Sequence, residues 1–422
     1  MNSSNRALKK VETRANEKLD TNTIARLGLS REEFQDMSKS KYNCTIEDFV
    51  ELNQELVVAK INQNMSILNI EGYEDFPVKK DDLIVMRMIN FIKLFHKNRV
   101  SPTNLFKRFY NTYRGEDLNN KNIGIWIYNA GIGDVIFISS VLRQLKIKYP
   151  RCYITMFVPQ PYMEFVNSWG LANMVMSNVF HFKYFYNCDY HLNFEFIIRS
   201  KEGELFNCYY NLFRRSFLQV SVKEAYPQFP PDPAFRKLWI NILKEKNIDN
   251  FIIVNFNSSN PMRCGSDKFS NNVLDMLKEY NIIFIDNKFV NDKIDKLIEG
   301  RSNCYNFTML SGGILQSIAL VSLARIVISV DTGMAHFSVG VGTPLFGIYG
   351  PFPAENRIAT YPNTKWVNAY CPSGKGSCCE HDCFFCEYWD NNGPECYNNI
   401  DLNKMKKDID ELVNLDINKK LF

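Results

Sequence analysis

The pattern of apolar and polar positions predicts alternating strands and helices along most of the chain. Short apolar runs rich in β-branched residues, which are typical of buried parallel strands, occur at 122–128, 153–158, 251–255 and 324–330. Two further candidate strands lie at 178–182 and 190–194. The first run is followed by a glycine-containing turn and then by apolar residues at helical spacing up to Tyr149. Because alternating strands and helices form parallel sheets, the pattern predicts an α/β protein in which a strand, loop and helix unit opens each half.

The pattern also divides the chain into parts. A proline-rich segment at 226–233 is typical of a linker between two α/β units. The segments 45–68 and 81–96 have apolar positions at helical spacing, which predicts helices in the N-terminal part. The segment 401–415 predicts a C-terminal helix. The predicted parts are a helical N-terminal region at 1–118, α/β domains at 119–235 and 236–400, and a C-terminal helix in 401–422.

Composition sets the outer limits of these predictions. A chain of 422 residues is too long for one ordinary core, and 45% hydrophobic with 23% charged residues is typical of a globular protein. The net charge of +4 does not indicate a nucleic-acid partner. The sequence contains no apolar run of 18 residues, and its first residues lack the apolar core of a signal peptide. We therefore expect a cytoplasmic protein, and the basic end of 81–96 leaves open a peripheral contact with the inner face of the membrane.

The segment Asp331-Thr332-Gly333-Met334 follows the strand predicted at 324–330 and is the best candidate for binding an anion. A helix beginning there would leave backbone N–H groups without intrahelical partners, and these groups bind phosphate well. Asp and Thr at such a position are also ordinary N-caps, so a structural role remains the alternative. Gly133 and Asp134 occupy the corresponding turn in the first unit.

Gly133-Asp134-Val135, preceded by an apolar strand, resembles the opening of the ADP-heptose:lipopolysaccharide heptosyltransferase-like enzymes, glycosyltransferase family 9. The segment 331–336, with Gly342-Thr343-Pro344 and Gly350-Pro351, is similar to the nucleotide-sugar signature of that family. The resemblance covers roughly residues 120 to 400 and implies the GT-B fold, in which two Rossmann-like domains face each other across a cleft. In enzymes of this fold a C-terminal helix commonly crosses back onto the first domain, and the resemblance implies such a crossing for the helix predicted at 401–415.

The resemblance also implies an activity. Such an enzyme moves a sugar, in this case a heptose, from a nucleotide diphosphate donor such as ADP-heptose to a hydroxyl group of a glycan or protein acceptor. Lipopolysaccharide biosynthesis is the process that the family name implies. The expected reaction inverts the sugar by direct displacement and uses no catalytic divalent metal.

Individual residues acquire expected roles from the same resemblance. Asp134 matches the family's loop aspartate and is the candidate general base, with helix N-capping as its alternative role. His336 is expected to donate to a phosphate or sugar oxygen. Lys268 resembles the family's lysine in the loop after the strand at 251–255, and Arg263 is a competing cation. The residues expected to contact the nucleotide sugar are Gly133, Asn257, Ser258, Lys268, Asp331, Thr332, Gly333 and Met334.

Six of the 12 cysteines lie between residues 371 and 396. Cys383-Phe384-Phe385-Cys386 has the two-residue spacing of a metal knuckle. Cys371, Cys378 or Cys379, and Cys396 could complete four thiolates around a structural zinc or iron ion, with His381 as a substitute ligand. Reduced thiols are the alternative, or disulfides if the protein is exported. Some bacterial protein heptosyltransferases of this type hold iron in this region, which supports the metal.

Two other functions stay open. A nucleotide-sugar epimerase or hydrolase of the same fold would act on the donor without an acceptor. A non-enzymatic module could instead use the cysteine cluster as a knuckle for binding a macromolecule. Residues 371–396 contain Lys375 as their only basic residue, against five acidic ones, which disfavours nucleic acid as the partner. The sequence leaves open the identity of the sugar, the identity of the acceptor and the oligomeric state.

Overall fold

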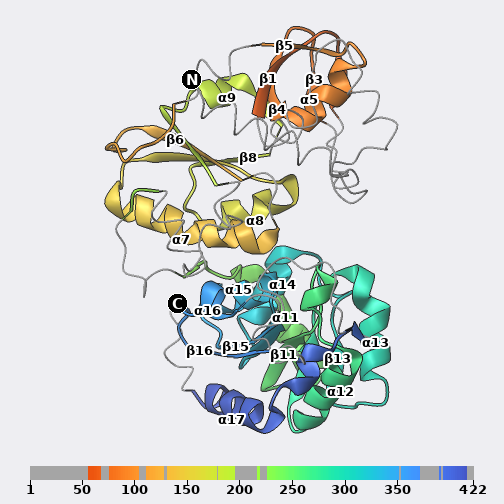
Figure 1. Ribbon diagram of the computed structural model, residues 1–422. Helices are drawn as coiled ribbons and strands as arrows, with labels where there is room; N and C mark the ends of the chain where they lie inside the picture. Colours follow the sequence, from red (N-terminus) through yellow and green to blue (C-terminus); the bar gives the residue numbers. More distant parts are fainter. Residues whose placement is uncertain are drawn as a thin grey trace, which may run out of the picture.

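The computed structural model shows two α/β domains and a small N-terminal sheet (Figure 1). The described residues are 56–67, 76–103, 111–127, 131–177, 179–194, 216–218, 226–350, 353–370, 389–390 and 393–415. Within this part of the chain, no helix is long and apolar enough to cross a membrane.

The C-terminal domain is built on a six-stranded parallel sheet. Its strands are β11 (Phe251–Asn255), β12 (Asn281–Phe284), β13 (Cys304–Asn306), β14 (Val327–Val330), β15 (Leu345–Tyr349) and β16 (Thr364–Asn368). Its helices are α11 (Pro233–Glu245), α12 (Asp267–Met276), α13 (Asn291–Ile298), α14 (Ile314–Val321), α15 (Gly333–Gly340) and α16 (Glu355–Ile358). The strand order is β13-β12-β11-β14-β15-β16. Strands β11, β14 and β15 are buried along their whole length, which agrees with the continuous apolar runs that predicted two of them.

The strand order determines where a ligand can bind. Sequence order runs outward from β11 in one direction and from β14 in the other, so the topological switch point lies between these two neighbouring strands. In doubly wound sheets the loops leaving the two strands at this point separate and open a crevice at the carboxyl ends. The loops that follow Asn255 and Val330 therefore border the expected binding crevice.

The first α/β domain has a four-stranded parallel sheet in the order β10-β6-β7-β8. Its elements are β6 (Asn122–Trp126), α7 (Ile132–Lys148), β7 (Tyr153–Phe157), α8 (Met163–Ser168), β8 (Met174–Met176), α9 (Phe182–Tyr186) and β10 (Tyr190–Asn193). Side chains of β6 alternate between two cores. Ile123 and Ile125 pack with α7, while Trp126 packs on the opposite face.

The N-terminal region is the main correction to the sequence prediction. The described part of 45–68 is not helical but forms β1 (Leu56–Ile61) and β2 (Met65–Ile67), and the helix expected at 81–96 is limited to α5 (Met88–Phe95). The remaining strands are β3 (Phe76–Val78), β4 (Leu83–Arg87), β5 (Val100–Pro102) and β9 (Phe180–His181). Strands β1, β4, β5 and β9 form a four-stranded sheet in the order β5-β1-β4-β9.

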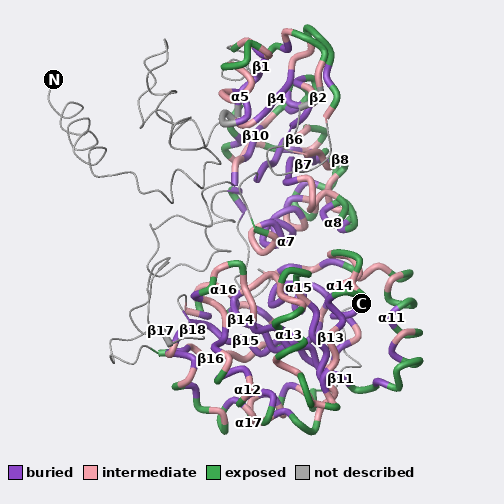
Figure 2. Tube along the Cα trace, turned by 90° about the vertical axis from the view of Figure 1, so that its right-hand side faces the viewer, coloured by how far each residue is buried: buried purple, intermediate pink, exposed green. Residues whose placement is uncertain are grey.

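Burial on both faces explains why the N-terminal strands were mistaken for helices. Val58 and Val85 pack against the face of the parallel sheet opposite α7, whereas Val57 and Ile84 face a second core beneath α5. A strand that is apolar on both sides has no alternation of apolar and polar residues, so its spacing also fits a helix. The N-terminal sheet thus covers the face of the parallel sheet opposite α7 (Figure 2).

Helices α7 and α8 lie between the first sheet and the C-terminal domain, and α7 packs against α15 (Figure 1). Phe229 of the linker joins this contact, because its ring lies edge-on to Phe165 of α8 at a centroid distance of 5.1 Å. Phe165 also meets Phe337 of α15 at 5.7 Å. The contact between the domains is therefore a packed aromatic cluster.

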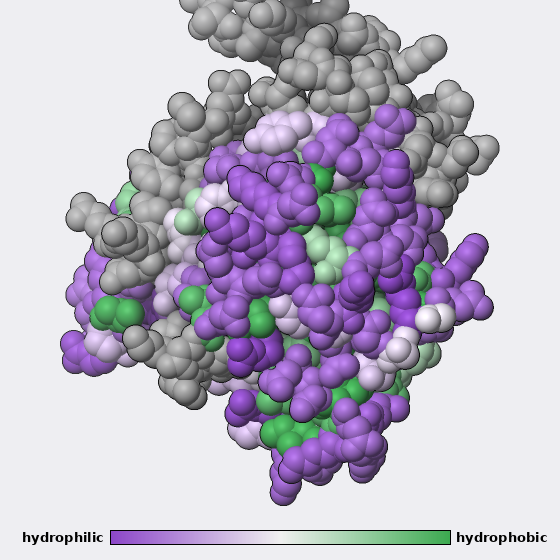
Figure 3. All heavy atoms as spheres, turned by 90° about the horizontal axis from the view of Figure 1, so that it is seen from below, coloured by the Kyte–Doolittle hydropathy of each residue, from purple (hydrophilic) through white to green (hydrophobic). Residues whose placement is uncertain are grey.

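The C-terminal helix α17 (Leu402–Val413) packs on α12, β15 and β16 of its own domain, so the expected crossing onto the first domain is wrong. Met405, Ile409 and Leu412 give α17 its buried face. The surface at this end of the molecule is mainly hydrophilic, with apolar side chains in small separate groups (Figure 3).

Candidate functional site

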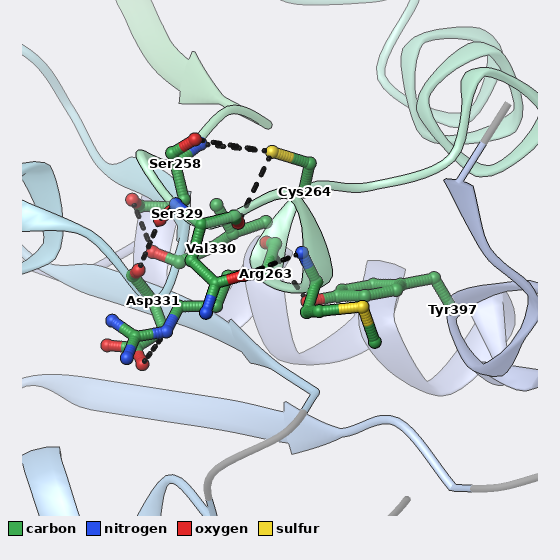
Figure 4. Close-up of polar contacts among 9 residues, drawn as sticks. Ser258, Arg263, Cys264, Ser329, Val330, Asp331 and Tyr397 are labelled. Atoms are coloured by element: carbon green, nitrogen blue, oxygen red, sulfur yellow. Dashed lines mark hydrogen bonds and ion pairs between the residues drawn. The ribbon is translucent and has the colours of Figure 1, made fainter. Parts of the chain in front are cut away.

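The two loops at the switch point of the C-terminal sheet are joined by a hydrogen bond. Ser258, in the loop after β11, donates through Oγ to the backbone oxygen of Asp331 after β14, at 3.3 Å (Figure 4). Cys264 supports the same loop from within, because its Sγ accepts from the Ser258 amide at 3.2 Å. The expected nucleotide residues Ser258 and Asp331 are therefore neighbours across the crevice.

A partly buried ion pair lies beside this hydrogen bond. Nε of Arg263 is 3.4 Å from Oδ2 of Asp331, and Asp331 is 4% exposed. Arg263 ends the short helix η3 (Pro261–Arg263), which Asn260 caps by accepting from the Met262 amide at 3.0 Å. Tyr397, which is fully buried, donates through its hydroxyl to the backbone oxygen of Arg263 at 3.0 Å. The loop therefore holds a guanidinium group at the switch point.

The two cations considered for nucleotide binding, Arg263 and Lys268, lie in different surroundings. Arg263 contacts Asp331, whereas Lys268 lies exposed in the first turn of α12. Ser266 caps that helix by accepting from the Phe269 amide at 3.1 Å, so Lys268 belongs to the helix rather than to the crevice loop. The sequence analysis names Lys268 as the nucleotide contact and Arg263 as its competitor, and that choice stays a prediction.

Asn257 is held by an aspartate that the sequence prediction missed. Asp286, which follows β12, accepts through Oδ2 from Nδ2 of Asn255 at 2.9 Å and from Nδ2 of Asn257 at 3.1 Å. Burial raises the pKa of Asp286, and a hydrogen bond from the Asn287 amide opposes this effect. The position of Asp286 directly after a parallel strand was the available signal.

Helix α15 begins where the anion site was predicted. Thr332 is its N-cap, because Oγ1 accepts from the Met334 amide at 3.1 Å. Thr332 therefore has the N-capping role that the sequence analysis gives as the alternative to binding an anion. Gly333 is essential for the close approach of the first domain, since an added Cβ would lie 2.5 Å from Cγ2 of Ile132. The starts of α7 and α15 thus meet at the crevice.

His336 lies in this contact and is 3% exposed. Its Nδ1 is 2.6 Å from the hydroxyl of Tyr361, and its ring lies 4.7 Å from that of Phe137 in α7. An added Cβ on Gly133 would lie 3.1 Å from Cδ2 and 3.5 Å from Nε2 of His336. Burial lowers the pKa of His336 to about 4, although the Asp331 carboxylate acts in the opposite direction. The imidazole is therefore neutral near pH 7.

Asp134 stands in the first turn of α7, next to Gly133, and is partly buried. Its Oδ2 accepts from the Gly131 amide at 3.0 Å, as the N3 residue of a capping box does. The capping role is therefore present, and the second carboxylate oxygen has no hydrogen bond to a described residue. The structure brings Asp134 and His336 to one inter-domain contact from sites about 200 residues apart in sequence.

Most of the cysteine cluster falls outside the described residues, including Cys371, Cys379, Cys383 and Cys386. Cys396 is described and is buried. Within the described ranges, no group of three or more His, Cys, Asp or Glu side chains could hold a metal ion.

One family model matches part of this chain. Residues 277–388 match the model of glycosyltransferase family 9 (heptosyltransferase). A comparison with curated protein sequences finds no match.

Solved structures resemble the whole fold of the two α/β domains. A glycosyltransferase family 9 protein from Veillonella parvula is 13% identical, with a TM-score of 0.56 over 71% of this chain and 99% of the other. The ADP-heptose lps heptosyltransferase II of E. coli is 11% identical, with a TM-score of 0.54 over 69% of this chain and 98% of the other. These two similarities confirm the predicted GT-B fold.

Proposed function

We propose that this chain, whose resemblance to glycosyltransferase family 9 is confirmed by the match over residues 277–388, is a glycosyltransferase that uses a nucleotide-sugar donor. One observation carries the proposal. The N-termini of α7 and α15, one from each domain, meet beside the switch point of the C-terminal sheet, where Arg263 also lies. Helix N-termini and a guanidinium group together match the charge of a diphosphate.

The donor is proposed to lie at the carboxyl ends of β11 and β14. The diphosphate would be bound by Arg263, in the place expected of Lys268, and by the N-terminus of α15. The residues proposed to contact the donor are Gly133, Asn257, Ser258, Asp331, Thr332, Gly333 and Met334. ADP-heptose is the proposed donor because the family name specifies heptosyl transfer and a similar structure is that of an ADP-heptose lps heptosyltransferase.

The proposed reaction is a direct displacement. Asp134 accepts the proton of the acceptor hydroxyl while that oxygen bonds to the anomeric carbon, and the bond from this carbon to the diphosphate oxygen breaks. Positive charge from Arg263 and the helix starts, with an N–H group of His336, stabilises the leaving diphosphate. These groups supply the stabilisation without a catalytic divalent metal. The domain at 119–235 would present the acceptor, a glycan or a protein, and the domain at 236–400 the donor.

A structural ion on the cysteine cluster is the second part of the proposal. The candidate ligands are Cys371, Cys379, Cys383, Cys386 and Cys396, four of which would hold zinc or iron. The residues just after the cluster support the donor loop, because Tyr397 donates to Arg263 and Ser266 donates through Oγ to Asn398 at 2.9 Å. An ion ordering this segment would therefore stabilise the loop that carries Arg263.

Elemental analysis tests the ion. We expect about one zinc or iron per chain, and Cys383→Ser should lower the melting temperature without changing which sugar is selected. A metal-free preparation that melts at the same temperature, with Cys383 and Cys386 both readily alkylated, would show that these residues are free thiols.

A panel of nucleotide sugars, measured by thermal shift, tests the proposed donor. A ligand that binds only the folded protein raises its melting temperature, and ADP-heptose should give the largest increase. Incubation with the same donor but without an acceptor separates the alternative activity, since an epimerase or hydrolase would change the sugar and a transferase would leave it largely intact. Absence of any shift across the panel would refute the proposed donor class.

A further inference from the structure

His336 has one hydrogen-bond partner among the described residues, and that partner is Tyr361. Both side chains are buried, with exposures of 3% and 5%, and their rings meet nearly edge to face at 84°. Tyr361 lies just after α16, where its amide donates to the backbone oxygen of Ile358 at 2.9 Å. Its hydroxyl therefore reaches Nδ1 from the side of the imidazole that is remote from α7.

The other imidazole nitrogen points toward the first domain. An added Cβ on Gly133 would lie 3.5 Å from Nε2, which places Nε2 at the start of α7. Helix starts present N–H groups and partial positive charge. What Nε2 can do there depends on whether it carries a proton, because a neutral imidazole has one donor and one acceptor nitrogen.

The direction of the hydrogen bond between Tyr361 and Nδ1 distinguishes the two forms. A buried phenol hydroxyl needs an acceptor for its proton, and the Nδ1 lone pair lies at 2.6 Å. If the hydroxyl donates to Nδ1, the imidazole proton must be on Nε2. The Nε2–H group then joins the helix N–H groups that face the crevice.

We propose that Tyr361 is a positioning residue that holds His336 in the Nε2–H form, so that His336 donates to an anionic oxygen of the donor where α7 and α15 meet. The ligand in this inference rests on the proposed function, whereas the hydrogen bond between Tyr361 and His336 does not. It gives Tyr361, a residue remote from all sequence motifs, a defined effect on transfer. The hydroxyl acts through His336 and does not touch the donor.

Nuclear magnetic resonance of ¹⁵N-histidine-labelled, ligand-free protein tests the hydrogen bond directly. The signals of His336 are assigned by their loss in His336→Gln. Near pH 7 the wild-type spectrum should show a protonated Nε2 and an unprotonated Nδ1, and Tyr361→Phe should shift both signals toward the average of the two forms. A wild-type spectrum with the proton on Nδ1 would overturn the proposal, even if Tyr361→Phe fails to fold.

Kinetics with ADP-heptose provide the second measurement. Tyr361→Phe should lower kcat about tenfold and change the donor KM less than about threefold, because the lost alignment matters most as charge develops on the diphosphate. Tyr349→Phe is the matched control, since it removes a buried hydroxyl that has no hydrogen-bond partner among the described residues. It should leave both the His336 signals and kcat unchanged.

Equal values of kcat for wild type and Tyr361→Phe would overturn the positioning role. The two proposals fail separately, because the spectrum of ligand-free protein tests the hydrogen bond and transfer by wild-type protein tests the proposed function.

Discussion

Asp134 is a residue with a structural and a proposed chemical role. Its carboxylate caps α7 through Gly131 and stands beside Gly133 at the crevice. Substitution by asparagine separates the roles, because an amide oxygen can still accept the Gly131 hydrogen bond but an amide is not a base.

We predict that Asp134→Asn lowers transfer by roughly 100-fold to 10,000-fold, the loss typical of a general base. Its free energy of unfolding should change by less than about 1 kcal/mol, because the cap is kept. Asp134→Ala should lose about as much activity and also about 0.5–2 kcal/mol of stability. Transfer rates, measured together with urea unfolding, give both quantities. Transfer by Asp134→Asn within threefold of wild type would leave the residue with capping alone.

Some residues of the candidate site could be proposed from the sequence, and others could not. Asp331, Gly133 and His336 were proposed from sequence because each lies in a short motif next to a predicted strand or helix, and their roles stay predictions. Tyr361 and Asp286 were not found, since their importance depends on neighbours distant in sequence. Local pattern contains no information about such pairs.

At the scale of elements, helix α15 packs closely against the linker at Gly340. The Phe229 amide donates to the backbone oxygen of Gly340 at 2.9 Å, and an added Cβ on Gly340 would lie 2.2 Å from Cζ of Phe229. The ring therefore lies directly on the helix backbone, in the aromatic cluster that joins the two domains.

We predict that Gly340→Ala destabilises the protein by about 1–3 kcal/mol, the usual result of overpacking a core. Phe229→Leu should also destabilise it alone, because a buried ring is lost. The double variant should lose less than the sum of the two, since leucine makes room for the methyl group. Urea unfolding of wild type, the two single variants and the double variant completes this double-mutant cycle. Additive losses would contradict the contact.

The sequence predicted helices and strands correctly where the spacing of apolar residues fits only one kind of element. Strands β6 and β11 are buried runs followed by helices, and an α/β fold follows from them. The short strand β9 illustrates the limit. Its residues fell within a predicted strand at 178–182, but it pairs with β4 of the N-terminal sheet rather than with the parallel sheet. Partner choice between sheets depends on long-range packing, which spacing does not encode.

At the scale of the whole molecule, buried histidines make stability depend on pH. Burial lowers the pKa of both His191 and His336 to about 4, from an ordinary value of 6.5. His191 accepts through Nδ1 from the Asn111 amide at 2.9 Å and stacks on Phe185. Below pH 6.5 the unfolded chain binds protons that the folded chain does not, so stability is present above this pH and falls as the pH approaches 4.

We predict that the two histidines together reduce the free energy of unfolding by up to ~2.7 kcal/mol per pH unit in this window. His336→Gln should remove about half of that slope, because only His191 then takes up a proton on unfolding. Urea unfolding between pH 7.5 and pH 5 measures the slope. An identical slope in His336→Gln would show that His336 titrates normally in the folded protein.

Sequence reasoning at the molecular scale gave the two α/β domains and their order, which the similar structures confirm. It did not give the sheet that covers the first domain, because strands buried on both faces resemble helices in spacing. The domain boundaries at 118, 235 and 400 remain predictions.

The central claim is that a diphosphate binds beside Arg263 at the switch point of the C-terminal sheet. Calorimetric titration of ADP into wild-type protein, Arg263→Gln and Lys268→Gln tests it most directly. Because Arg263→Gln leaves the Asp331 carboxylate buried without its partner, the double variant with Asp331→Asn serves as the control for folding.

We predict that Arg263→Gln and the double variant bind ADP about 10-fold to 100-fold more weakly than wild type, the value of a lost hydrogen bond to a charged group. Lys268→Gln should bind within about twofold of wild type, since that side chain lies exposed on α12. Wild-type affinity in a folded Arg263→Gln protein, or a large loss in Lys268→Gln, would contradict the account.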